Sequence, residues 1–231
     1  MTLLNTILKE VIQRGSEIFG VLDLQEKFWP HPGQYLSCQR IGDAMSILPV
    51  NLFRVLGSTD VLTVGPFSDT WQPGDDLVCT PPRGHGFNIP VSARRVGLIP
   101  YDVSPWYLLS LATGVLSTGG EVVLFSDSTL LLELLVWMPA PVEVLPLAAL
   151  VEDPGWPDYL ALDLEVSAFG RFVDEVPFQW VQCEGEVLVR TSMPCHGVGD
   201  CGVCAVHTRG GWRLACMDGP VFPIAEVFDV A

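Results

Sequence analysis

The stretch Met193-Pro-Cys-His-Gly-Val-Gly-Asp-Cys-Gly-Val-Cys204, followed by Cys216-Met-Asp-Gly-Pro-Val-Phe222, is the most informative part of this sequence. It holds four cysteines with the spacing Cys195-x5-Cys201-x2-Cys204-x11-Cys216. The glycines between them allow sharp turns that bring backbone N–H groups close to sulfur, and such hydrogen bonds tune iron–sulfur clusters. Four thiolates gathered on loops of this kind predict a metal site that needs no ligand from elsewhere in the chain.

Zinc is the main alternative occupant of such a site. A structural zinc site of four cysteines usually has two short C-x2-4-C pairs, and only Cys201-x2-Cys204 has that form here. Plant-type 2Fe–2S ferredoxins use the related run C-x4-C-x2-C with a distant fourth cysteine. The spacing therefore favours an iron–sulfur cluster over zinc, and over a disulfide pair or free thiols. With four cysteines present, we expect His196 and His207 to lie at the surface or beside the site rather than to act as ligands.

The segment from Met193 to Phe222 resembles the C-terminal part of the electron-transfer subunit of type B dihydroorotate dehydrogenase, an iron–sulfur flavoprotein. That family typically reads M-x-C-G-x-G-x-C-x-x-C, then a short hairpin, then V-C-x-x-G-P-V-F. The tail Leu214-Ala-Cys-Met-Asp-Gly-Pro-Val-Phe222 follows this pattern closely, whereas His196 lengthens the first loop by one residue. The resemblance implies a 2Fe–2S cluster bound by Cys195, Cys201, Cys204 and Cys216.

The charge of the chain limits its partners. Its 231 residues include 27 acidic and 12 basic side chains, for a formal net charge of −15. Nucleic acids and anionic membrane surfaces select basic patches, so the sequence argues against both. An acidic surface is suited to steering toward a basic patch on another protein. The histidines form no nucleophile–base pattern, and we predict no catalytic residues; they are His31, His85, His196 and His207.

The sequence predicts neither a signal peptide nor a membrane insertion. Charged side chains interrupt the apolar part of residues 1–20, and prolines and glutamates interrupt the most apolar stretch, Leu130–Val151. We therefore expect a cytoplasmic protein. In a reducing compartment, cysteines serve as thiols or metal ligands, so the remaining Cys38, Cys79 and Cys183 are expected to be buried small apolar residues.

Residues 1–92 predict an antiparallel β-barrel. Short segments rich in β-forming residues, such as Gln34–Gln39, Asn51–Leu56 and Leu77–Thr80, are bounded by Gly, Pro and Asp. Several short strands at this spacing are typical of a small barrel.

Residues 93–180 predict a small parallel α/β layer. Arg95–Ile99 and Glu121–Phe125 are short apolar runs, and Trp106–Leu116 between them has the length and apolar face of a helix. This strand–helix–strand order is what a parallel sheet produces. A second helix is expected over residues 128–138.

The order of barrel (1–92), α/β layer (93–180) and Cys-rich 2Fe–2S module (181–231) is also that of the resembled family, whose core is ferredoxin-reductase-like. Short family motifs occur in the same order at Pro32–Tyr35, Asn51–Gly57, Gln72–Leu77 and Pro82–Phe87. The resemblance therefore implies an FAD-binding-like barrel followed by a nucleotide-binding-like domain.

Two departures from the family bear on its cofactors. Where the family has R-P-x-S at the flavin, this chain reads Asp43-Ala-Met-Ser46, so a carboxylate replaces the arginine that would pair with pyrophosphate. Where the family has G-G-G-x-G-x-x-P, this chain reads Leu98-Ile-Pro-Tyr-Asp-Val-Ser-Pro105, without a glycine for phosphate approach. The two departures argue against binding of FAD, and they argue more strongly against binding of NAD(P). If FAD is retained, its expected contacts are Ser46, Gly84, Gly86 and Phe87.

Together these features predict an electron-transfer subunit with no catalysis of its own. It would pass electrons to or from a flavin-containing catalytic dehydrogenase in a hetero-oligomer. The resemblance implies a partner of the dihydroorotate dehydrogenase kind and a role in pyrimidine biosynthesis. The alternative is a non-catalytic structural or regulatory subunit, in which an iron–sulfur or zinc site only stabilises the fold of a small module.

Overall fold

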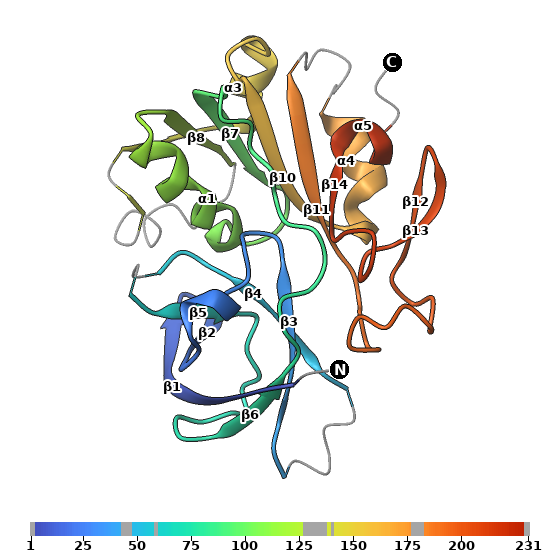
Figure 1. Ribbon diagram of the computed structural model, residues 1–231. Helices are drawn as coiled ribbons and strands as arrows, with labels where there is room; N and C mark the ends of the chain where they lie inside the picture. Colours follow the sequence, from blue (N-terminus) through green and yellow to red (C-terminus); the bar gives the residue numbers. More distant parts are fainter. Residues whose placement is uncertain are drawn as a thin grey trace.

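The computed structural model describes residues 3–42, 48–57, 60–126, 138–139, 141–176 and 183–228. Figure 1 shows a β-barrel built from the N-terminal strands, an open sheet beside it, and a small hairpin formed by strands late in the chain. None of the helices in the described ranges is long and apolar enough to span a membrane.

Six strands form a closed antiparallel barrel: β1 (Leu4–Arg14), β2 (Glu17–Leu22), β3 (Tyr35–Arg40), β4 (Val50–Arg54), β5 (Leu62–Gly65) and β6 (Asp76–Cys79). Their order around the barrel is β1-β2-β5-β4-β3-β6, and a 3-10 turn, Glu26–Phe28, follows β2. In β1, Leu4, Thr6 and Leu8 are buried and the residues between them are exposed, as expected of a strand with one face on a core. The predicted barrel is confirmed.

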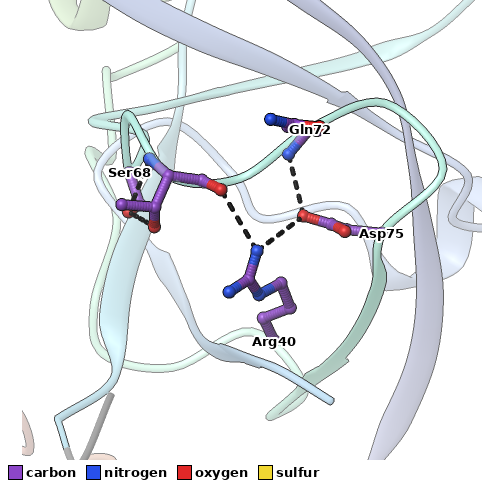
Figure 2. A network of polar contacts seen from close by, with 5 residues as sticks. Arg40, Ser68, Gln72 and Asp75 are labelled. Atoms are coloured by element: carbon purple, nitrogen blue, oxygen red, sulfur yellow. Dashed lines mark hydrogen bonds and ion pairs between the residues drawn. The ribbon is translucent and has the colours of Figure 1, made fainter. Parts of the chain in front are cut away.

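A polar network ties the loop between β5 and β6 to the end of β3 (Figure 2). Arg40 Nη1 donates to the Thr70 carbonyl at 3.1 Å and lies 3.4 Å from Asp75 Oδ2. The same carboxylate oxygen accepts the Gln72 backbone N–H at 2.8 Å, and the Ser68 and Thr70 hydroxyls are 2.8 Å apart. Because Arg40 and Asp75 are only half-buried, this pair shapes the loop and adds little stability.

The barrel corrects the expectation for two cysteines. Cys38 on β3 and Cys79 on β6 are direct partners in the antiparallel register and are joined by a disulfide. Both are fully buried, so their burial was predicted correctly and their bond was not. Residues directly opposite each other on antiparallel strands have Cβ atoms about as close as a disulfide needs. Cys183 is a free, half-buried thiol, and burial raises its pKa to about 11.

The second body is a six-stranded sheet: β7 (Arg95–Pro100), β8 (Glu121–Phe125), β9 (Val142–Leu145), β10 (Tyr159–Glu165), β11 (Glu184–Arg190) and β14 (Val221–Pro223). The order is β14-β11-β10-β7-β8-β9, and only β14 runs antiparallel to its neighbour. The central strands β7 and β10 are buried along almost their whole length, as in a parallel sheet covered on both faces.

The helices that pack around this sheet are α1 (Trp106–Ser117), α3 (Leu147–Glu152), α4 (Phe169–Glu175) and α5 (Ile224–Val227), with a 3-10 turn at Val166–Ala168. Figure 1 shows α1 between the sheet and the barrel, and α4 and α5 near β14. The predicted strand–helix–strand order of β7, α1 and β8 is confirmed. The helix expected over 128–138 lies outside the described residues, except for residue 138.

The predicted cluster module is divided between this sheet and a small separate unit. Strands β11 and β14 belong to the sheet, whereas β12 (Ala205–Thr208) and β13 (Gly211–Leu214) form a hairpin of their own. Figure 1 shows this hairpin standing beside the sheet. A domain boundary at residue 181 therefore cuts through the sheet, because the apolar run Val187–Val189 is buried within it.

Asp158 holds the start of β7. Its carboxylate accepts the backbone N–H groups of Arg94 and Arg95 and pairs with the Arg95 guanidinium at 2.8 Å. The hydrogen bond from the Arg95 side chain, followed by the backbone N–H groups, lowers the pKa of Asp158 from its ordinary 3.8 to about 2. A carboxylate whose folded pKa is lowered contributes stability above its unfolded pKa and loses it as the pH falls through the folded pKa.

We therefore expect Asp158→Asn to lose less stability than the parent protein on acidification from pH 3.8 to about pH 2. Urea denaturation at a series of pH values measures this difference. Equal acid sensitivity of the two proteins over that interval would contradict the assigned role.

Candidate metal centre

The four-cysteine site (Cys195, Cys201, Cys204 and Cys216) is built on two loops. The first loop leaves β11 and runs to β12, and the second joins β13 to β14. Gly197 and Gly199 have φ of +72° and +85°, in the left-handed region that favours glycine. A Cβ on Gly197 would lie 2.6 Å from the Tyr35 hydroxyl, so this turn also needs glycine to approach the barrel.

The thiols of the site contact one another in a chain. Burial alone would raise the pKa of Cys195. Hydrogen bonds from the Gly199 N–H, the Cys201 thiol and the Val198 and Cys201 N–H groups instead lower that pKa to about 7. Burial, followed by contacts with the Cys204 and Cys195 thiols, raises the pKa of Cys216 to about 12. The Cys204 sulfur accepts the Cys216 N–H at 3.5 Å.

These contacts fit a thiolate-bound metal group. Thiolates are the ligands of iron–sulfur clusters and of zinc, and N–H groups aimed at sulfur are a feature that sets cluster potential. In the part of the chain that the structure describes, no three His, Cys, Asp or Glu side chains already meet the geometry of a metal site. The thiols therefore contact one another in pairs, and thiolate chemistry suits either metal.

Burial divides the site into an inner and an outer half. Cys204 and Cys216 are each 1% exposed and belong to the main hydrophobic core. Cys201 is exposed, and Cys195 is half-buried. Apolar side chains that are about half exposed lie on the same loops, and we call them the exposed rim: Val198, Val203 and Met217.

Three barrel residues hold the two loops in place. The Tyr35 hydroxyl donates to the Cys216 carbonyl at 3.2 Å, and Asn51 Nδ2 donates to the Met193 carbonyl at 3.0 Å. The Ser37 hydroxyl lies 3.1 Å from Nδ1 of His196, so the extra residue of the first loop contacts the barrel. Sequence reasoning missed these supports, because nothing local relates β3 and β4 to loops that lie more than a hundred residues further along the chain.

The residues expected to contact FAD are placed as follows. Ser46 lies outside the described residues, as does Asp43. A Cβ on Gly84 would lie 2.5 Å from the Gly219 carbonyl, and a Cβ on Gly86 would lie 2.6 Å from the Pro32 carbonyl. The Phe87 N–H also donates to Pro32. The turn that contains Gly84, Gly86 and Phe87 thus packs between the barrel and the second loop of the four-cysteine site, and these contacts account for both glycines.

Side chains of the protein pack against one another beside the loop Leu98–Pro105, at the carboxyl edge of the parallel sheet; we call this packed edge the filled crevice. The carboxyl ends of parallel strands are where α/β folds bind ligands. At this edge Arg190, at the end of β11, donates to both oxygens of the fully buried Asp163 on β10, with Nε 2.6 Å from Oδ1. The Arg190 guanidinium also stacks 4.0 Å from the centre of the Tyr107 ring.

The same edge carries further polar pairs. Asp102, in the loop, pairs with Arg171 of α4 at 2.7 Å, and the Tyr101 hydroxyl donates to Glu175 at 2.5 Å. Glu17 reaches the crevice from the barrel strand β2, and one of its oxygens is buried without a hydrogen-bond partner among the described residues. Burial raises the pKa of Glu17.

A family model described as the iron–sulfur cluster binding domain of dihydroorotate dehydrogenase B matches residues 191–228. The matched segment contains all four cysteines of the site and the β12–β13 hairpin. The sequence matches none of the curated proteins with which it was compared.

Solved structures share the fold of the chain. The NADH-dependent reduced ferredoxin–NADP oxidoreductase, studied for flavin-based electron bifurcation, has a TM-score of 0.70 at 16% identity, and the match covers 96% of this chain and 89% of that one. The ferredoxin reductase of carbazole 1,9a-dioxygenase has a TM-score of 0.54 at 16% identity, covering 69% and 61% of the two chains. Ferredoxin–NADP+ reductase from Plasmodium falciparum has a TM-score of 0.53 at 10% identity, covering 76% and 91%.

These likenesses show a ferredoxin-reductase-like fold over most of the chain, with an iron–sulfur cluster binding domain at residues 191–228. The comparisons therefore assign a family only to the cluster-binding segment, residues 191–228, and the rest of the chain is placed by its fold.

Proposed function

We propose that this protein carries a 2Fe–2S cluster on Cys195, Cys201, Cys204 and Cys216 and serves as the electron-transfer subunit of an oxidoreductase complex. The observation that carries the proposal is the family match over residues 191–228, within which the four thiols contact one another. A cluster bound there supplies one-electron transfer, and the protein supplies its position, burial and hydrogen bonds.

The residues around the site have separable roles in this proposal. Backbone N–H groups of Val198 and Gly199 point at the Cys195 sulfur and would stabilise its thiolate. Tyr35 and Asn51 hold the carbonyls of Cys216 and Met193 and so position the two loops. The burial of Cys204 and Cys216 excludes water from the inner half of the site.

The exposed rim is the proposed approach for the redox partner. Cys201 and the apolar side chains of Val198, Val203 and Met217 are accessible there, on a chain with a net charge of −15. Acidic surfaces increase association rates with basic ones. We therefore propose a flavin-containing catalytic dehydrogenase with a basic docking face, in a cytoplasmic hetero-oligomer. The family supports a dihydroorotate dehydrogenase-like partner and a role in pyrimidine biosynthesis.

The packed side chains at the carboxyl edge of the sheet, the filled crevice, argue against binding of a nicotinamide cofactor. Because Arg190, Asp163 and Tyr107 occupy the carboxyl edge of the sheet, we propose that this chain does not use NAD(P) directly, and FAD remains a secondary proposal. We expect NADH alone to leave the visible spectrum of the anaerobic protein unchanged, while dithionite bleaches it. Anaerobic spectrophotometry measures both, and rapid bleaching by NADH without a reductase would contradict the assignment.

The proposed function is tested by purifying the protein without oxygen and assaying iron, sulfide, zinc and flavin on one sample, with spectra before and after dithionite. About two irons and two sulfides per chain, with a visible band that bleaches on reduction, would support the electron carrier. A colourless protein with about one zinc per chain would support the alternative, a structural subunit in which zinc bound by four thiolates holds the two loops together. That alternative draws on the burial of Cys204 and Cys216 in the main core. The flavin assay decides whether FAD is retained.

A further inference from the structure

A groove of about 630 Å³ lies between the barrel, the segment that leads from the barrel to β7, and the outer side of α1. We propose that it binds a small planar aromatic molecule that carries an anionic group. The groove is separate from the proposed metal centre, because none of its lining residues comes from the matched segment 191–228. Its volume is in the range of small-molecule sites in proteins.

The charge of the groove is opposite to that of the chain. Acidic side chains outnumber basic ones by 27 to 12 in the sequence, yet Arg54 and Arg94 both line the groove and no Asp or Glu does. Arg54 ends β4 of the barrel, and Arg94 precedes β7, so the two cations come from the two bodies of the molecule. Arginine recognises carboxylate, sulfonate and phosphate groups through its planar set of donors. Arg94 Nη1 donates to the Thr118 carbonyl at 2.8 Å, and Arg54 stacks on Trp29 with Glu26 nearby, so both guanidinium groups are held in place. Each has five N–H donors, and those left over can bind an anion.

The rest of the wall is apolar. Phe87 and Ile89 are half-buried against the main core, and Val91 beside them is 95% exposed. Helix α1 contributes Leu111 and Val115 to the lining. An apolar lining favours an apolar ligand body, and the guanidinium of arginine stacks on flat aromatic rings.

Gly114 leaves the helical wall open. It lines the groove on α1, it is exposed, and a Cβ built on it would meet no atom within 4 Å. Glycine inside a helix lowers its stability relative to alanine, and packing does not demand it at this position. The missing side chain therefore provides space in the groove rather than relief of a clash.

The occupant can be tested with 1-anilinonaphthalene-8-sulfonate, a fluorescent aromatic anion, by fluorescence titration with direct excitation and by calorimetry on the full chain. We expect saturable binding near one site per chain. Gly114→Trp should abolish that binding by filling the groove from an exposed helix position. Gly170→Trp is the matched control: Gly170 is an exposed glycine of α4, also with nothing within 4 Å of its Cβ position, and it lies outside the groove. We expect it to bind the probe as the parent does.

The charge requirement is tested separately with Arg54→Gln and Arg94→Gln. Each should weaken binding of the anionic probe about tenfold, since a hydrogen bond to a charged group is lost, and leave binding of the neutral analogue N-phenyl-1-naphthylamine unchanged. Competition by benzoate and by AMP shows whether a carboxylate or a phosphate is preferred. Three results would overturn the proposal. The first is binding of the probe that persists in Gly114→Trp, and the second is an equal loss of binding in Gly114→Trp and Gly170→Trp. The third is that the arginine variants weaken the anionic and the neutral probe equally. None of these readouts depends on the metal, so they can fail independently of the proposed electron-transfer function.

Discussion

Replacing Cys204 with serine is expected to remove the visible absorption of the proposed cluster and to reduce bound iron from the proposed two or so per chain to near zero. Cys204 is 1% exposed, contacts the Cys216 thiol and accepts the Cys216 N–H, so a serine hydroxyl there would leave the inner half of the site with one thiolate. The measurement is iron and sulfide content with an absorption spectrum of anaerobically purified protein. Because serine is nearly isosteric with cysteine, circular dichroism should retain its strand and helix signal.

Cys183→Ser is the matched control for this prediction. Cys183 is a half-buried free thiol that precedes β11 and is not part of the four-cysteine site. That variant should keep its full iron content and spectrum. Iron retained in Cys204→Ser, or iron lost equally in both variants, would show that these cysteines do not form the proposed site. Loss of the circular dichroism signal in Cys204→Ser would show that the loops cannot be separated from the main core.

Replacing Arg190 with methionine is expected to destabilise the fold by about 3–5 kcal/mol, the usual effect of removing one partner of a buried ion pair. Asp163 is fully buried on the central strand β10, and its two oxygens both accept hydrogen bonds from Arg190. Without the arginine, a buried carboxylate is left with no cation to balance it. Urea denaturation of the parent and the variant measures the difference.

Two controls distinguish loss of the charge pair from loss of packing. The double variant Arg190→Met with Asp163→Leu should recover most of the lost stability, because apolar replacement of a buried pair is often neutral.

The second control is the pH dependence of stability. Burial raises the pKa of Asp163, and without Arg190 its neutral form is favoured further. A carboxyl whose folded pKa is raised loses stability as the pH rises through that pKa, so the deficit of Arg190→Met should shrink at acid pH. A deficit that is independent of pH and unrelieved in the double variant would mean that Arg190 acts through packing on Tyr107.

The filled crevice connects this prediction to function. A ferredoxin-reductase-like fold presents the carboxyl edge of its parallel strands to a ligand. Here an ion pair, an aromatic ring and a glutamate from the barrel take that space. The pair itself joins the neighbouring strands β10 and β11, and the Arg190 guanidinium extends from it to Tyr107 of α1.

Much of the architecture could be predicted from local pattern. The short segments rich in β-forming residues, bounded by Gly, Pro and Asp, predicted the barrel, and the apolar runs around Trp106–Leu116 predicted the parallel layer. The spacing of the four cysteines led to the family that the match over residues 191–228 supports. The assignment of residues 181–231 to a separate module overlooked β11 and β14, because a buried run such as Val187–Val189 does not reveal which sheet receives it.

The sequence by itself determined the cysteine spacing, the turns that glycine permits between the thiols, and the absence of glycine and arginine where the resembled family has its phosphate-binding motifs. These properties involve residues close together in the chain, where geometry follows from residue type. Only the tertiary structure decided the Cys38–Cys79 disulfide, the support of the cysteine loops by Tyr35 and Asn51, and the Arg190–Asp163 pair that fills the crevice. Each of these depends on strand register or on the docking of distant elements, and many registers are compatible with the same local pattern.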